Sequence, residues 1–286
     1  MLHRVAAYAL ETCLIVFCGF MIAFGQSAQP NNVAKEAIDK AQAAYLKKDY
    51  ALARRELESA LAIRMDLAEA HLLLGMVAWQ EGKVDDAIRS LQEAVKYQPN
   101  YPDAHYVMGK LYFEMRNWKR AEEEANLALG QGSKLANLHV LLGDIALARS
   151  QFEQAVKFLE QALAQPSLNS DVANETRMKI EAVKNFVEFQ ANMGNKNFQF
   201  PKHTAKAQIP KPVPFRDVTV RLAGILNNQG RFTSLLVLGS SDRQMTEKYL
   251  QFAAQNQYTP ATKNGAPVPI WFTVVYQTST RIDVIR

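Results

Sequence analysis

The 286-residue sequence predicts an α-solenoid of about four helix-pair repeats with a capping helix, followed by a small α+β domain of order β-β-α-β. Small residues recur every 34 residues through the middle of the chain, which indicates a helical repeat. From about residue 215, apolar β-rich segments alternate with turn residues, which indicates a separate sheet-containing unit. With 48% hydrophobic and 21% charged residues, the composition is that of a globular protein and excludes bulk disorder or a multi-pass membrane protein.

The N-terminus, residues 1–28, has the pattern of a signal peptide or a membrane anchor. Arg4 precedes an apolar or small run over residues 13–25, and small residues lead to Ala28. Residues 5–25 are nearly long enough to span a bilayer if Glu11 is tolerated, so cleavage and retention are both open. Either alternative predicts an exported body, periplasmic or anchored in the inner membrane of a Gram-negative-type envelope. Both cysteines lie in this segment, so the folded body has no disulfide or thiol nucleophile.

The next region, residues 33–194, carries the repeats. The positions that share the 34-residue spacing are small or apolar: Ala53, Ala87, Ala121 and Ala155; Ala60, Ala94, Ala128 and Ala162; Gly75, Gly109 and Gly143. The second repeat, LLLGMVAWQEGKVDDAIRSLQEAVKYQPN, has the clearest pattern. These residues resemble the tetratricopeptide (TPR) repeat family. The resemblance implies four repeats over about residues 33–169 and a polar capping helix over about residues 171–193.

TPR arrays bind peptide segments on the face lined by the first helix of each repeat, so the resemblance also implies a partner-binding groove. Its register assigns one set of residues to that face and a second set beside it: Tyr45, Trp79, Phe113 and Leu147; Tyr106, Lys110 and Asp144. A row of rings with a few polar anchors suits a protein or peptide partner. The alternative is that these rings pack against neighbouring helices or against the chain's own linker.

Three histidines, His71, His105 and His139, also recur at 34 residues and invite a metal site. Equivalent helices of adjacent repeats lie about 8–10 Å apart, too far for three imidazoles to share one zinc ion. We therefore expect no metal site, and we expect these histidines to have structural roles. The alternative is a pH-sensing role through charging of the imidazoles.

Residues 195–214 contain four prolines and four lysines without an acidic residue, so they predict an extended linker. Beyond it we expect strands over residues 217–226 and 231–238 joined by a turn at residues 227–230. A capping box of Ser241 and Gln244 then begins a helix over residues 242–255. A turn over residues 263–265 and a long strand over residues 268–277 complete the unit.

The C-terminal residues resemble the C-terminal domain of TonB-type proteins, and the resemblance assigns residues 215–286 to such a domain. The resemblance rests on FAAQNQYTPA (Phe252–Ala261), NGAPV (Asn264–Val268) and the strand IWFTVVYQ. It implies structural roles for five residues: Gly230, Tyr258, Pro260, Asn264 and Gly265. Asn256 stands where the family usually has tryptophan.

Charge is unevenly distributed between the two regions. Residues 196–286 hold 12 Lys and Arg against four Asp and Glu, whereas residues 31–195 hold 20 against 23. The basic end suits an acidic partner: peptidoglycan carboxylates, an anionic membrane surface or an acidic protein patch. A basic surface with no dedicated ligand is the alternative, and an exported chain excludes nucleic acid.

The sequence contains no constellation of nucleophile, base and metal ligands, so we expect a non-enzyme without a cofactor. The predicted function is a periplasmic scaffold or adaptor that binds one partner in the TPR groove and another through the basic TonB-like domain. The alternative is a TonB-type energy transducer that supports transport across the outer membrane, with an outer-membrane receptor as partner.

Overall fold

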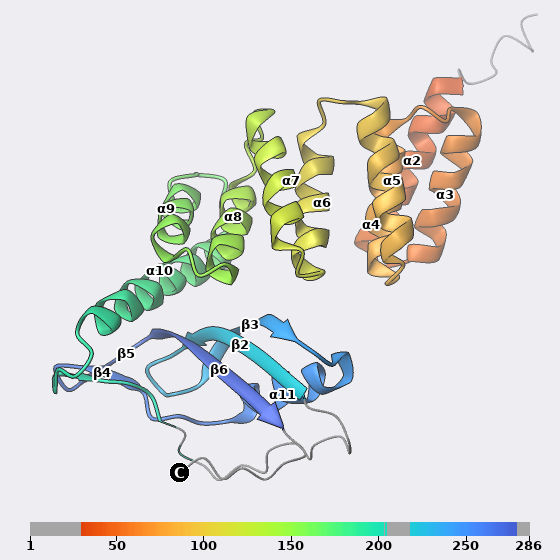
Figure 1. Ribbon diagram of the computed structural model, residues 1–286. Helices are drawn as coiled ribbons and strands as arrows, with labels where there is room; N and C mark the ends of the chain where they lie inside the picture. Colours follow the sequence, from red (N-terminus) through yellow and green to blue (C-terminus); the bar gives the residue numbers. More distant parts are fainter. Residues whose placement is uncertain (1–29, 203, 205–217, 279–286) are drawn as a thin grey trace, which may run out of the picture. The chain divides into compact units, whose positions relative to one another are not determined.

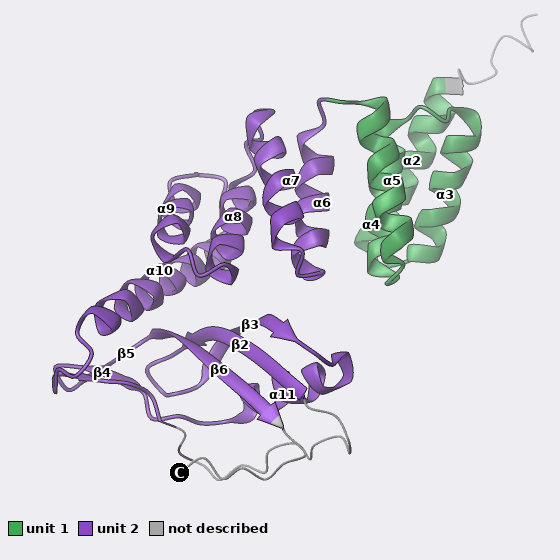
Figure 2. Cartoon of the chain, viewed as in Figure 1, with its two compact units in different colours: residues 1–99 green, residues 100–286 purple. Residues whose placement is uncertain are grey.

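The computed structural model describes residues 30–202, 204 and 218–278, so the predicted signal peptide or anchor lies outside the described residues. The described residues form a run of helices followed by two small sheets and a further helix (Figure 1). The chain divides into two compact units, residues 1–99 and residues 100–286 (Figure 2). The division falls after Pro99, within the region of repeats and not at residues 195–214.

Unit 1 contains the first two helix pairs. Their helices are α2 (Pro30–Leu46), α3 (Tyr50–Ile63), α4 (Ala68–Gln80) and α5 (Val84–Tyr97). Within the unit, α2 packs on α3 and α4, and α4 packs on α5. Its core is rich in alanine, with Leu57 and Val77 as the large side chains at its centre.

Unit 2 begins with two further pairs and a longer helix. The helices are α6 (Pro102–Glu114), α7 (Trp118–Gly130), α8 (Ala136–Ala148), α9 (Phe152–Leu163) and α10 (Ser170–Ala191). The predicted helix-pair repeats and the long helix after them are therefore confirmed, with boundaries within a few residues of those expected.

The 34-residue recurrence of small residues has a direct packing cause. The alanines of this register are completely buried between paired helices. A Cβ at Gly143 would lie 2.6 Å from Cδ2 of Leu159 on the partner helix, and a Cβ at Gly75 would lie 2.8 Å from Cγ of Leu91. Real Cβ atoms do not approach so closely, so glycine lets α4 pack on α5, and α8 on α9, around a large leucine.

The C-terminal part of unit 2 contains two three-stranded antiparallel sheets. One has the order β3-β2-β6, from β2 (Val218–Leu226), β3 (Phe232–Ser240) and β6 (Ile270–Thr278). The other has the order β1-β4-β5, from β1 (Phe198–Gln199), β4 (Ala261–Lys263) and β5 (Ala266–Val268). The helix α11 (Arg243–Gln255) follows β3, so the predicted β-β-α-β order is present with the short second sheet added.

Both faces of β2 are covered. Val220 and Leu222 contribute to a core with Tyr249 of α11, whereas Ala223 and Ile225 contribute to a core with residues of α8, α9 and α10. The central strand is therefore apolar on both sides, as expected for a strand between two helical layers.

The last helix of the solenoid is not the polar cap that the sequence predicted. Phe189 of α10 is fully buried, and Phe186 packs in the same apolar clusters as residues of β2 and β6. Asn185 Nδ2 donates a hydrogen bond of 2.7 Å to the carbonyl oxygen of Pro269, and Lys263 Nζ lies 2.6 Å from a carboxylate oxygen of Glu188. The C-terminal sheet therefore takes the place of a solvent-facing cap.

The predicted linker also begins differently. Phe198 and Phe200 lie 5.0 and 5.3 Å from Phe189, measured between ring centroids, and β1 pairs with β4. The first residues of the segment 195–214 are thus part of the fold, because their aromatic rings have an apolar site to fill. Residues 203 and 205–217 lie outside the described residues.

A smaller correction concerns the start of α11. Its N-cap is Asp242, which accepts a hydrogen bond from the backbone N–H of Met245, and not Ser241. The Ser241 hydroxyl instead accepts from the backbone N–H of Thr219, which ties the helix start to β2. A carboxylate is a good N-cap acceptor beside the positive end of a helix, so the helix begins one residue later than the capping box implies.

Candidate partner-binding groove

Four of the residues predicted for the groove line one hollow of about 350 Å³ in unit 2. The hollow lies on α6 and α8, with one side chain from the first turn of α10. Its lining combines aliphatic and aromatic side chains with a few polar ones: Tyr106, Lys110, Phe113, Glu114, Asn137, Val140, Leu141, Asp144 and Val172. We call this hollow the unit 2 groove.

The α6 side of the unit 2 groove carries its aromatic rings. Phe113 is half-buried and packs against Trp118, with ring centroids 5.1 Å apart. Lys110 Nζ lies 5.9 Å from the centroid of the Tyr106 ring, within the range of a cation–π contact. Burial raises the pKa of the Tyr106 hydroxyl, so this group remains a neutral hydrogen-bonding group at physiological pH.

The far wall is fixed by an ion pair between α8 and α10. Lys179 Nζ lies 2.9 Å from Asp144 and 3.1 Å from Glu175. Burial raises the pKa of the Asp144 carboxyl, and Lys179 opposes that rise. Burial lowers the pKa of Lys179, but Asp144 and Glu175 more than offset this, so its pKa is raised. The Asp144 charge is therefore neutralised within the protein and has a positioning role.

Three of the predicted groove residues lie elsewhere. Tyr45 and Trp79 belong to unit 1, where both are half-buried and Tyr45 packs against Tyr50 with ring centroids 5.8 Å apart. Leu147 is only 1% exposed and belongs to the core shared with Ile225 and Trp271 of the sheet. Its assignment to a binding face is therefore wrong, because the position that would be open in a free solenoid is covered here.

The prediction also missed groove residues, although the repeat register contained the signal for one of them. Val140 stands 34 residues after Tyr106, which was assigned to the groove. Val172 comes from α10, whose packing could not be read from the repeat. The groove is consequently more aliphatic than a stripe of aromatic rings alone.

The C-terminal residues singled out by the sequence have structural roles. Gly230 has φ +73°, and a side chain there would overlap the carbonyl oxygen of Tyr258. The backbone N–H of Tyr258 donates 2.9 Å to the Gly230 carbonyl oxygen. Asn264 and Gly265, with φ of 53° and 80°, form the two-residue turn between β4 and β5. Pro260 lies half-buried just before β4.

The three histidines have separate surroundings. His71 Nε2 lies 2.9 Å from the carbonyl oxygen of Met65, and His105 Nδ1 lies 2.7 Å from a carboxylate oxygen of Glu124. Burial lowers the pKa of His139, whose Nδ1 has no hydrogen-bond partner among the described residues. Within residues 30–202, 204 and 218–278, no group of three or more His, Cys, Asp or Glu is placed to hold a metal ion.

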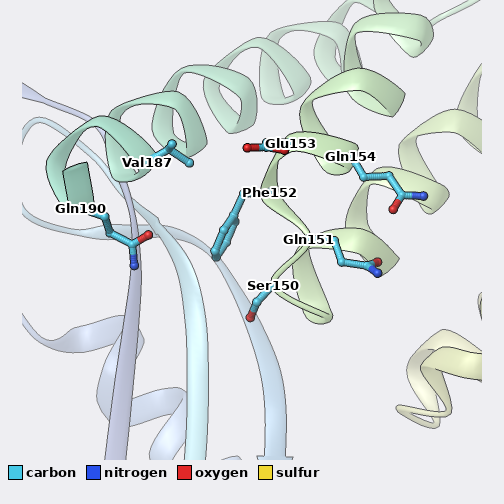
Figure 3. Close-up of a pocket in the computed structure, with 7 residues that line it drawn as sticks. All are labelled: Ser150, Gln151, Phe152, Glu153, Gln154, Val187 and Gln190. Carbon is cyan, nitrogen blue, oxygen red and sulfur yellow. The ribbon is translucent and has the colours of Figure 1, made fainter.

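A second hollow, of about 430 Å³, lies where α9 begins beside α10 (Figure 3). Phe152 and Val187 form its apolar part. Phe152 also packs edge-on against Phe186, with ring centroids 5.0 Å apart. Its polar residues are mostly uncharged: Ser150, Gln151, Glu153, Gln154 and Gln190. None of them was predicted as a site residue, because no spacing or motif distinguishes them from a solvated helix face.

No helix in the described part of the chain is both long and apolar enough to cross a membrane. This finding concerns only the residues that the structure describes.

Comparisons with known proteins agree with the helical architecture. Residues 77–115 match the family model described as TPR repeat. Human tetratricopeptide repeat protein 21B is 22% identical over 115 residues, which cover 39% of this chain and only 9% of the human protein.

Solved structures give a similar result. The pilF protein of Pseudomonas aeruginosa is similar with a TM-score of 0.51 and 15% identity, over 57% of this chain and 74% of that one. MamA from Desulfovibrio magneticus RS-1 has a TM-score of 0.44 and 16% identity, over 55% of this chain and 97% of that one. At 15% identity, the similarity to pilF shows a shared fold and nothing more. The helical part of this chain is therefore a TPR-type solenoid.

Proposed function

We propose that this chain is a non-catalytic scaffold or adaptor of the cell envelope, whose unit 2 groove holds an extended segment of a partner protein. TPR proteins act as protein-interaction scaffolds, and the helical part has this architecture. The observation that carries the proposal is the convergence of Tyr106, Lys110, Phe113 and Asp144 in one hollow. Residues chosen from the repeat register alone are thereby brought together from two helices.

The chemistry of the groove favours a segment with a large apolar side chain. Phe113, Val140 and Val172 offer apolar surface, and removing such surface from water contributes about 25 cal/mol per Å². Asn137 is exposed and can both donate and accept hydrogen bonds, which suits a peptide backbone. Because Asp144 is already paired with Lys179, a cationic partner residue gains little there.

The cell-envelope part of the proposal rests on the N-terminal and C-terminal sequence. Arg4 and the apolar run over residues 13–25 favour export, and the basic character of residues 196–286 favours an acidic partner such as peptidoglycan or an outer-membrane receptor. A body in the periplasm, free or anchored at the inner membrane, is consistent with both.

Site-directed photo-crosslinking in the native cell tests the groove. A photoreactive phenylalanine analogue at position 113 is expected to cross-link a discrete partner, whereas the same analogue at the exposed position Leu127 on α7 is not. The variant Phe113→Ala, checked for an unchanged helical circular dichroism spectrum, should weaken partner capture. Equal cross-linking from positions 113 and 127 would count against the groove.

A second proposal is a TonB-type energy transducer. It is supported by the order of β2, β3, α11 and β6, which matches the predicted β-β-α-β unit. The N-terminal sequence of the protein from its own envelope separates the two proposals. A start near Gln29 leaves no inner-membrane anchor and contradicts transduction, whereas a retained Met1 keeps it.

A further inference from the structure

The turn between α6 and α7 carries an arginine at a position where the backbone favours glycine. Arg116 has φ of 59°, and Gly82, the equivalent residue one repeat earlier, has φ of 75°. A positive φ is costly for a residue with a Cβ and easy for glycine. The turn lies at the end of these helices that faces the C-terminal elements of unit 2 (Figure 1). The needs of the turn alone therefore do not explain an arginine here.

The Arg116 side chain is half-buried beside the start of α11. Burial lowers the pKa of Arg116, the charge of Glu247 opposes this effect, and the charge of Arg243 adds to it. Both side chains of α11 are therefore close enough to act on the Arg116 guanidinium. Arg116 stays charged, because a guanidinium is not deprotonated in proteins. The structure thus holds a positive charge partly out of water and near a second positive charge.

No protein group pairs directly with this charge. Within residues 30–202, 204 and 218–278, the structure records no ion pair or hydrogen bond for the side chains of Arg116, Arg243 and Glu247. Arginine is rarely withdrawn from water without a paired anion, because removing a charge from water is costly. The Arg116 guanidinium therefore has donors available for an anionic ligand.

A third guanidinium lies at the same end of the sheet. The Arg221 side chain on β2 lies against Gly239, near the end of β3, where a Cβ would be 3.2 Å from Nη2 of Arg221. Arg243 follows Gly239 by four residues, and both Arg221 and Arg243 are exposed. Of the acidic residues at this junction, Asp242 is engaged as the N-cap of α11, and Glu247 is exposed. Positive charge therefore predominates where β3 leads into α11.

We propose that Arg116 and Arg243 form a binding site for a carboxylate of an acidic segment of a partner protein, with Arg221 as an outer contact. A guanidinium presents parallel N–H donors that match the two oxygens of a carboxylate. A phosphate group offers similar oxygens but carries about −1.5 to −2 charge at pH 7, so Glu247 would repel it more strongly.

The site combines a residue of the solenoid with residues of the C-terminal elements, so neither part would form it alone. The inference rests on the proposed adaptor function for the class of its ligand. It does not depend on the unit 2 groove being occupied, because no residue of the site lines that groove.

The test uses the full chain and two synthetic peptides. One is a short peptide of alternating glutamate and glycine, and the other has glutamine in place of each glutamate. The Nε–H signals of Arg116 and Arg243 in two-dimensional NMR spectra report on the site directly, and single-arginine variants assign them. We expect both signals to shift on addition of the glutamate peptide and to stay unchanged with the glutamine peptide.

Charge variants separate binding from stability. Arg116→Gly removes the guanidinium and relieves the positive φ, so it should bind the glutamate peptide about two- to fivefold more weakly without unfolding at lower urea. Lys48→Gly is the matched control, because Lys48 is an exposed cation of unit 1 with φ of 62°, and it should leave binding unchanged. Arg243→Gln should weaken binding as Arg116→Gly does. Glu247→Gln should strengthen it, because a repelling carboxylate is removed.

The proposal is overturned by absent shifts of the two arginine signals, by equal shifts with both peptides, or by equal weakening in Arg116→Gly and Lys48→Gly. An Arg116→Gly variant that unfolds at lower urea and binds as the wild type does would assign Arg116 a structural role instead. Tighter binding of inorganic phosphate than of the glutamate peptide would overturn the choice of a carboxylate. Photo-crosslinking from position 113 tests the groove separately, so failure of one proposal is distinguishable from failure of the other.

Discussion

Replacing Trp271 by alanine should destabilise α10 as well as the strand that carries the tryptophan. Trp271 is 4% exposed and lies in the core cluster that joins β2 and β6 to α8, α9 and α10. Removing a buried tryptophan side chain costs about 3–5 kcal/mol. For a unit of this size, each kcal/mol lowers Tm by about 2–4 °C, so a decrease of about 6–20 °C is expected.

Hydrogen exchange followed by mass spectrometry is the decisive assay for Trp271→Ala. Peptides from α10 and from β6 should lose protection together, because one cluster holds both. Val275→Ala on the same strand is the control, since Val275 is 54% exposed and its truncation should cost little. If α10 keeps its full protection while β6 loses it, the sheet and the helix are not one cooperative unit and the reasoning fails.

The remaining predictions concern single features of the fold. Gly143→Ala should cost about 1–3 kcal/mol by overpacking against Leu159, whereas Gly130→Ala, where a Cβ meets open space, should not destabilise; urea unfolding of both variants compares them. Burial lowers the pKa of His139 below its ordinary 6.5, so neutral imidazole is favoured in the folded state and its contribution to stability is lost as pH falls below 6.5. The Tm of His139→Gln should therefore decrease less than that of the wild type between pH 7 and pH 5, and equal decreases would contradict this. Gly265→Val should cost about 1–2 kcal/mol because φ is +80° in a two-residue turn, and thermal unfolding should show the loss in unit 2 only.

The helical part could be predicted from the sequence because its packing is periodic. Each helix pair repeats the same close approach, so Ala53, Gly75 and their counterparts recur at a fixed spacing. The same register located Tyr106, Phe113 and Asp144 in the groove. Because the same packing pattern recurs in four repeats, it can be recognised in the sequence even though the helix propensity of any single residue is a weak guide.

The docking of the C-terminal sheet could not be predicted in this way. It depends on contacts between residues far apart in the sequence, such as Asn185 with Pro269 and Glu188 with Lys263, and these occur once each. Leu147 illustrates the consequence, because its register position indicates an open face and its surroundings bury it. The N-cap of α11 was misplaced for a related reason, since Ser241 is engaged by Thr219 of β2.

The helices α8 and α10 connect the unit 2 groove with the C-terminal sheet. The helix α10 contributes Val172 to the unit 2 groove near its start and buries Phe189 against the C-terminal elements near its end. The helix α8 contributes Asp144 to the groove and Leu147 to the core under the sheet. If a flexible linker joined two binding surfaces, the distance between their bound partners would vary. The effective concentration of one partner near the other would then depend on the length of the linker. Because the groove and the C-terminal sheet are built on one packed unit, a partner bound in the groove and a partner bound at the sheet would instead be held at a defined separation, which suits a scaffold that orients its partners.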